Sequence, residues 1–146
     1  MRYTPRKHLP HEVPSWVKNG ELYFFTLCAQ KRAQVDLTEP KIGRCLLDAA
    51  RYYHKQHRWR ARLFLLMPDH LHALISFPSN EVIRKCWRDW KRYTAKQTFV
   101  EWQRDILEHR IRSDESWEEK AFYIRQNPVR QKLVKNANLW SWVFET

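Results

Sequence analysis

Residues 63–77 read LFLLMPDHLHALISF, an apolar run that contains two histidines set one residue apart. In a strand, side chains alternate between two faces, so His70 and His72 share one face roughly 7 Å apart. The opposite face then carries the apolar residues Leu71, Ala73 and Ile75. Ring nitrogens amid hydrocarbon need partners, because leaving one buried and unpaired costs about 1–3 kcal/mol. A metal ion is one such partner, and neighbouring polar groups or water are the alternative that this spacing leaves open.

Two apolar segments flank the break at Pro68-Asp69. Residues 60–67 and 69–77 are joined by a link too short for a helix, so they are predicted to pair as an antiparallel hairpin. Upstream, residues 21–28 (ELYFFTLC) are apolar on both faces, which is typical of a central strand. Downstream, residues 102–112 predict a short fourth strand.

Helical periodicity fills the segments between these strands. Thr38 is the predicted cap of a helix that runs to about residue 57. Ser79 or Asn80 is the predicted cap of a second helix. Its buried stripe comprises Ile83, Cys86, Trp87, Trp90 and Thr94.

The C-terminal part carries a third helical signal. Ser116 to Glu119 has the form of a capping box, and Pro128 is expected to end the helix that it opens. Asn127 can cap a final short helix over residues 129–134. The final segment, LWSWVFET at 139–146, is expected to cover the core.

This order of strand, helix, strand, strand, helix, strand and helix predicts an α+β ferredoxin-like sandwich. The histidine strand would be central in one antiparallel sheet, with helices packed on it. We expect a single domain over residues 1–146, in which residues 1–20 form an irregular basic arm because their prolines oppose a helix.

The chain is strongly basic. Lys and Arg number 27 against 16 Asp and Glu, for a net charge of +11, and this balance favours nucleic acid as partner. The second predicted helix has a basic face that could track phosphates or could simply be solvated: Arg84, Lys85, Arg88, Lys91 and Arg92. His109 and Arg112 are further candidates for DNA contacts, and Trp87 or Trp90 could stack on unpaired bases.

Cysteine usage and hydropathy indicate the cellular compartment of the protein. Cys28, Cys45 and Cys86 lack any close pairing, which predicts free core thiols in a reducing environment. No apolar run of about 18 residues and no secretory signal occur, so we expect a cytoplasmic protein without a membrane partner.

Two segments together resemble a known family. MPDHLHALI, residues 67–75, is followed by YIRQNPVRQKLV, residues 123–134. This pair is similar to the motifs of the single-tyrosine HUH transposases (IS200-like) and, within them, of the REP-associated tyrosine transposases. The resemblance runs from about Leu22 to Trp142. It implies a domain that cleaves and rejoins single-stranded or hairpin DNA through a 5′-phosphotyrosine, without a nucleotide cofactor.

The same resemblance implies the roles of four residues. His70 and His72 would bind Mg²⁺ or Mn²⁺, and Asn127 would complete the metal site. Tyr123 would be the nucleophile, and it shares a helix face with Asn127 at this spacing. Because a phenol ionises only near pH of about 10, attack at neutral pH needs such an ion nearby. A monomer is favoured over a homodimer.

Two other functions stay open on the sequence. The ferredoxin-like fold also serves proteins that bind structured nucleic acid without cutting it. A zinc-dependent hydrolase could use His70 and His72 with a carboxylate. However, no Glu lies beside the histidines, and Asp69 is expected to point to the other face of the strand.

Overall fold

The structure is a computed structural model that describes Pro14, Trp16 and residues 20–146. The basic arm predicted over residues 1–20 therefore lies outside the described residues, apart from Pro14, Trp16 and Gly20.

Five strands form one sheet at the centre of the described chain. They are β1 (Leu22–Cys28), β2 (Arg60–Leu66), β3 (His70–Ser76), β4 (Leu107–Arg110) and β5 (Val143–Glu145). Their order is β4-β1-β3-β2-β5, and each pair of neighbours is antiparallel. The first four strands have the order of a ferredoxin-like sheet, so the predicted α+β fold and the central place of the histidine strand are confirmed.

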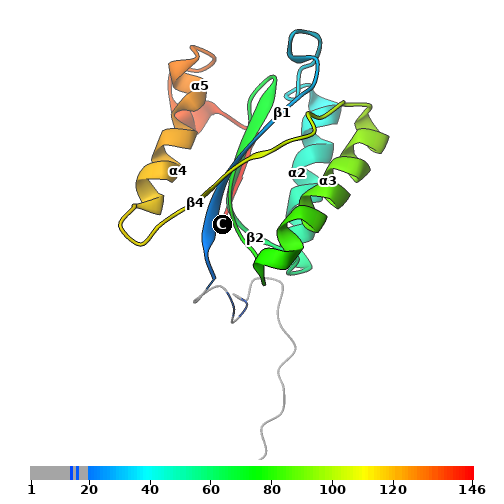
Figure 1. Ribbon diagram of the computed structural model, residues 1–146. Helices are drawn as coiled ribbons and strands as arrows, with labels where there is room; N and C mark the ends of the chain where they lie inside the picture. Colours follow the sequence, from blue (N-terminus) through cyan, green and yellow to red (C-terminus); the bar gives the residue numbers. More distant parts are fainter. Residues whose placement is uncertain (1–13, 15, 17–19) are drawn as a thin grey trace, which may run out of the picture.

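Helices cover both faces of this sheet (Figure 1). The longer helices α2 (Pro40–Lys55) and α3 (Ile83–Thr98) pack on one face, and the shorter α4 (Trp117–Arg125) and α5 (Asn127–Arg130) lie on the other. We refer to residues 117–130 as the α4–α5 arm. Short 3-10 turns occur at Arg32–Gln34, Asn80–Val82 and Ala137–Leu139.

The sheet divides the apolar core into two clusters. The larger cluster, under α2 and α3, takes Leu71, Ala73 and Ile75 of β3. The smaller cluster, under α4, takes Leu74 of β3 together with Ala121 and Ile124. The predicted alternation of β3 is therefore confirmed, and it leaves His70 and His72 on the face shared with the α4–α5 arm.

The predicted hairpin is confirmed, because β2 and β3 pair antiparallel on either side of Pro68-Asp69. The fourth strand is shorter than predicted: only residues 107–110 pair with β1, although Trp102 makes an isolated bridge to Ala29.

Two predicted helix caps are wrong. The side chain of Glu39, rather than Thr38, caps α2 by accepting from the backbone N–H groups of Lys41 and Ile42. Thr38 instead donates its hydroxyl to Asp36. Asn127 makes no side-chain cap, because α5 begins at Asn127 itself with Gln126 in the cap position. Ser116 does cap α4, by accepting from the Glu119 N–H.

The C-terminal segment is more than a cover for the core. Phe144 is buried as predicted, but residues 143–145 also form β5, which pairs with the edge of β2. Of the three cysteines, all are free, yet only Cys86 is fully buried, so the expectation of three core thiols is wrong for Cys28 and Cys45.

Gly43 of α2 makes room for the C-terminal segment. A Cβ atom at this position would lie 2.5 Å from Cζ3 and 2.6 Å from Cε3 of the Trp142 indole. Ala normally favours a helix over Gly by about 1 kcal/mol. Here we expect Gly43→Ala to destabilise the protein by about 1–3 kcal/mol, because the overpacked indole must move. Urea unfolding of both proteins measures the difference.

The control is a double-mutant cycle with Trp142→Ala. Once the indole is gone, Gly43→Ala should be neutral or stabilising. Stabilisation by Gly43→Ala in the presence of Trp142 would contradict the packing argument.

Candidate active site

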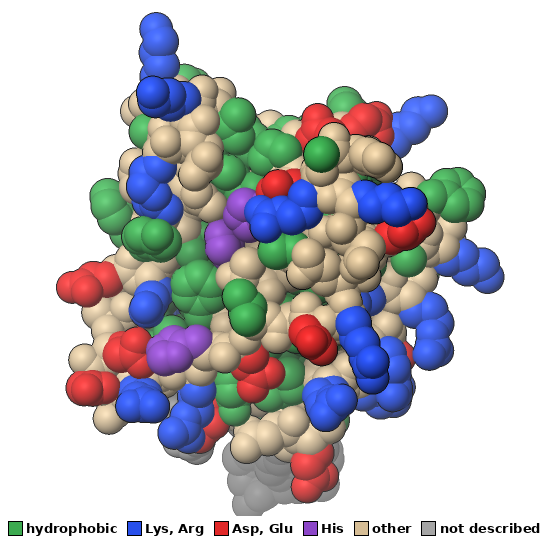
Figure 2. Space-filling view, turned by 45° about the horizontal axis from the view of Figure 1, so that its top comes forward, with side chains coloured by type: hydrophobic (Ala, Val, Ile, Leu, Met, Phe, Trp, Pro, Cys, Tyr) green, Lys and Arg blue, Asp and Glu red, His purple; other side chains and the backbone are tan. Residues whose placement is uncertain are grey.

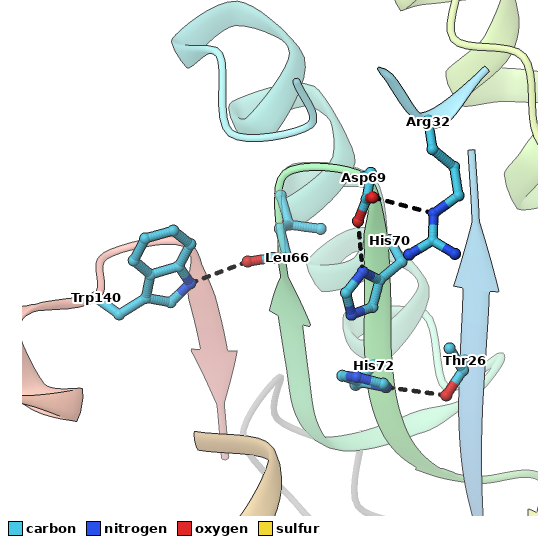
Figure 3. A network of polar contacts seen from close by, with 7 residues as sticks. All are labelled: Thr26, Arg32, Leu66, Asp69, His70, His72 and Trp140. Carbon is cyan, nitrogen blue, oxygen red and sulfur yellow. Dashed lines mark hydrogen bonds and ion pairs between the residues drawn. The ribbon is translucent and has the colours of Figure 1, made fainter. Parts of the chain in front are cut away.

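The two histidines of β3 are each anchored through Nδ1 (Figure 3). His70 donates from Nδ1 to Oδ1 of Asp69 at 2.7 Å, and His72 Nδ1 is hydrogen bonded to Oγ1 of Thr26 on β1 at 2.9 Å. The ring centroids are 4.8 Å apart. These bonds leave Nε2 of each ring for a further partner, which is the arrangement that metal-binding imidazoles adopt in proteins.

Asp69 is itself held in place by Arg32. The Arg32 Nε donates to Asp69 Oδ2 at 3.0 Å, so the carboxylate bridges the guanidinium and the imidazole. Partial burial would raise the pKa of Asp69, but the hydrogen bonds from Arg32 and His70 outweigh it and lower that pKa. The prediction that Asp69 points away from the histidines is wrong, because Asp69 precedes β3 and is not bound by strand alternation.

Removing this carboxylate should weaken metal binding. We expect Asp69→Ala to lower the affinity for Mn²⁺ by about 10- to 100-fold, the usual effect of losing a group that orients a ligating histidine. Asp69→Asn keeps an acceptor oxygen and should retain most of the affinity. Titration followed by the electron paramagnetic resonance of free Mn²⁺ measures this change.

A matched control is Asp89→Ala. Asp89 is an acid on α3 that pairs with Arg58 and Lys85. An equal loss of Mn²⁺ affinity in this variant would show that the effect comes from net charge and not from the orientation of His70.

His72 is favoured in its neutral form. Burial, followed by the positive charges of His70 and Arg130, lowers its pKa to about 4, against a smaller opposing effect of a hydrogen bond with the Phe25 backbone. A neutral imidazole is the form that ligates metals. The ring also contacts Phe24 of β1 edge-on, with centroids 5.5 Å apart.

Tyr123 lies on the outer surface of α4. Its side chain is 58% exposed, and its hydroxyl has no hydrogen-bond partner in the described part of the chain. The Arg130 guanidinium lies over the ring at 3.9 Å from its centroid. Tyr123 and Phe24 also line a shallow pocket of ≈ 460 Å³ together with residues 114–116, Glu119 and Lys120. Phe24 therefore borders both the His72 ring and the pocket that Tyr123 lines.

Asn127 is the third metal ligand that the family resemblance implies. It is 8% exposed at the start of α5, and no hydrogen bond to its side-chain amide occurs among the described residues. The amide is not among the fully buried polar groups that lack a partner, so it keeps contact with solvent. Its oxygen is of the kind that binds divalent ions.

The donor set therefore fits a divalent metal ion. Two imidazoles and one amide oxygen would be its protein ligands, leaving further positions for water or phosphate. Within the described residues, no cluster of three or more His, Cys, Asp and Glu side chains could hold a metal. The carboxylate of Asp69, next to His70 in the chain, already accepts hydrogen bonds from Nδ1 of His70 and from Nε of Arg32.

The site opens to solvent. In Figure 2, histidine side chains reach the surface and are bordered by hydrophobic, acidic and basic side chains. His70 keeps 17% of its side-chain surface exposed.

His109 lies on the same face of the sheet, because it pairs with Phe24 across β4 and β1. Its Nε2 contacts both carboxylate oxygens of Glu115 at 3.0 Å, so it is engaged within the protein. Arg112 is exposed nearby and uses its backbone N–H to bond Glu115. Both residues are thus bonded to Glu115, which lines the pocket beside Tyr123.

Helix α3, which carries the predicted basic face, packs on the face of the sheet opposite the histidines (Figure 1). Arg84, Arg88 and Arg92 are exposed there. Lys85 is paired with Asp89, and Lys91 donates to the carbonyl oxygens of residues 103 and 104, so both lysines are engaged within the protein.

The suggestion that Trp87 or Trp90 stacks on bases is wrong. The two indoles are 2% and 0% exposed and belong to the larger core cluster.

Sequence reasoning missed three side chains that the fold brings to the site: Thr26, Arg32 and Arg130. Thr26 is found only through the pairing of β1 with β3. Arg32 and Arg130 reach in from outside the strands, and Arg130 could have been noticed because it follows Tyr123 in the same motif.

No helix among the described residues is long and apolar enough to cross a membrane.

Comparisons with known proteins agree on one family. Residues 19–141 match the model described as "Transposase IS200 like". The chain is 26% identical over 144 residues to a Haemophilus influenzae protein whose name places it among the REP-associated tyrosine transposases, covering 84% of this chain and 78% of that protein. It is 22% identical over 128 residues to the REP-associated tyrosine transposase of Escherichia coli (strain K12), covering 86% and 76%.

A solved structure shares the fold. It is that of a REP-associated tyrosine transposase bound to a REP hairpin, with a TM-score of 0.72, 21% identity, and coverage of 98% of this chain and 82% of that chain.

Proposed function

Because the chain belongs to the family of IS200-like transposases, we propose that it cleaves and rejoins single-stranded or hairpin DNA through a covalent bond to Tyr123. His70, His72 and Asn127 would hold Mg²⁺ or Mn²⁺. The observation that carries this proposal is the anchoring of both imidazoles through Nδ1 on the sheet face beside the α4–α5 arm.

The proposed reaction is a transesterification. The Tyr123 hydroxyl oxygen attacks a backbone phosphorus atom, so an O–P bond to the tyrosine forms as the bond to the 3′ oxygen breaks. The phenolic proton passes to solvent, and the departing 3′ oxygen takes a proton from solvent. The products are a 5′-phosphotyrosine and a free 3′-hydroxyl. Since one ester replaces another, a later 3′-hydroxyl can reverse the step without a nucleotide cofactor.

Each residue contributes a separate part of this chemistry. Mg²⁺ or Mn²⁺, when bound, would polarise the scissile phosphate and offset its charge. Asp69 and Thr26 hold the imidazoles in one orientation. Tyr123, exposed on α4, is accessible to a strand that lies across the sheet face. We propose that the chain acts as a monomer.

The DNA partner follows from charge and relationship. The related transposase is bound to a REP hairpin in its structure, and this chain carries a net charge of +11. We propose that Arg84, Arg88 and Arg92 contact phosphates of a part of the DNA away from the cut, because α3 lies on the far face of the sheet. His109 and Arg112 would contact DNA at the edge of the Tyr123 pocket.

The test is a covalent-adduct assay with the full chain, Mn²⁺ and hairpin DNA labelled at either end. A 3′ label should stay with the protein on a denaturing gel, whereas a 5′ label should appear on a shortened free strand. A chelator should abolish both products. Tight binding without any adduct across varied hairpins would instead support a noncatalytic DNA-binding protein of this fold.

A further inference from the structure

Arg130, the last residue of α5, holds Tyr123 at two points. Its guanidinium carbon is 3.9 Å from the centroid of the Tyr123 ring. Its Nη2 donates to the Tyr123 carbonyl oxygen at 2.8 Å. One bond thus fixes the guanidinium to the backbone of the tyrosine, while the planar face of the group covers the aromatic ring.

No hydrogen bond from the described residues holds the Tyr123 ring. The side chain is exposed and its hydroxyl is free of hydrogen bonds there. An exposed tyrosine exchanges among rotamers, and most of these take the hydroxyl away from any one phosphate. Stacking of a guanidinium on an aromatic face is favourable, so Arg130 is positioned to limit this exchange.

A guanidinium has five N–H donors in a rigid plane, and the Tyr123 carbonyl uses one of them. The remaining donors belong to a guanidinium that covers the Tyr123 ring, so they are close to any phosphate that meets the Tyr123 hydroxyl.

During attack, the negative charge of the tyrosyl oxygen is added to that of the phosphate. Donors already in place for this added charge lower the barrier, because they need no rearrangement as the charge develops. Arginine suits this task since its fork matches two phosphate oxygens.

We propose that Arg130 is a second catalytic side chain: it orients the Tyr123 ring and binds a non-bridging oxygen of the phosphate that Tyr123 attacks. This inference rests on the proposed function. It concerns a residue of the α4–α5 arm and not the metal ligands, so the two can be tested apart.

The experiment compares single-turnover cleavage of hairpin DNA by the wild type, Arg130→Gln and Arg130→Lys at saturating Mn²⁺. Arg130→Gln should lower the rate about 100-fold, as the loss of one preorganised donor does in other enzymes. Arg130→Lys should recover part of the rate, because it restores the charge but not the planar face. The dissociation constant for uncut hairpin should change less than about fivefold, since one phosphate contact among several is lost.

The matched control is Arg125→Gln. Arg125 belongs to the same arm and pairs with Glu145, so its removal deletes the same charge without uncovering the Tyr123 ring. It should cleave at close to the wild-type rate. In addition, millimolar guanidinium should partly restore cleavage by Arg130→Ala, and Mn²⁺ affinity should not change in any of these variants.

Three results would overturn the inference while leaving the proposed function intact. They are a normal rate in Arg130→Gln, an equal loss in Arg125→Gln, or a loss of hairpin affinity as large as the loss of rate. Absence of an adduct with the wild type would instead remove the proposed function, and this inference with it.

Discussion

Tyr123→Phe is expected to abolish the covalent protein–DNA adduct, with a loss of cleavage of at least about 10⁴-fold, because the attacking oxygen is gone. The substitution removes a single exposed hydroxyl that makes no hydrogen bond among the described residues. The ring, its contact with Arg130 and the packing of α4 are kept. Folding and hairpin binding should therefore match the wild type. The measurement is the fraction of labelled DNA retained with protein on a denaturing gel.

The chain offers two controls of the same chemistry. Tyr52 and Tyr93 are also exposed, at 59% and 51%, but they belong to α2 and α3 on the far face of the sheet. Tyr52→Phe and Tyr93→Phe should form adduct at the wild-type rate. An adduct that persists in Tyr123→Phe and disappears in either control would assign the nucleophile elsewhere.

The second large effect is expected from the histidines. His70→Ala and His72→Gln should each lower Mn²⁺ affinity by more than about 100-fold, beyond the loss caused by an orienting neighbour, because a ligand itself is removed. Cleavage should fall with it. Hairpin binding in the presence of a chelator should be unchanged, since it does not use the ion. Isothermal titration with Mn²⁺ and a gel-shift assay measure the two properties separately.

His109→Ala is the matched control for this pair. It removes an imidazole from the same face of the sheet. This imidazole lies on the edge strand β4 and is bound to Glu115. Its Mn²⁺ affinity should equal that of the wild type. Unchanged Mn²⁺ affinity in both His70→Ala and His72→Gln would show that the metal binds elsewhere or not at all.

Much of the fold could be predicted because its signals are local. The alternation of β3 is forced by two different clusters on its two sides, so Leu71 and Leu74 can be assigned to opposite faces from the sequence. The short link at Pro68-Asp69 then requires a hairpin. By contrast, β5 was missed because it has only residues 143–145, and its pairing with the edge of β2 depends on tertiary structure.

The errors in the site arise where rules for local sequence do not reach the tertiary structure. Strand alternation was extended to Asp69, one residue before β3 begins, where the backbone is free to turn the carboxylate back to His70. A local capping rule was applied to Asn127, but α4 and α5 follow each other so closely that Gln126 takes the cap position. Arg32 and Arg130 act through long side chains, whose reach has no period in the sequence.

The division of the core into two clusters leads us to expect that the α4–α5 arm opens at a lower temperature than the sheet. In α4, only Ala121 and Ile124 are fully buried, and both belong to the smaller cluster. Strand β3 contributes buried residues to both clusters. Segments with few buried contacts open at lower free energy than the rest of a domain. We therefore expect warming to separate Tyr123 from the histidines before the sheet melts, and cooling to restore their arrangement without refolding of the domain.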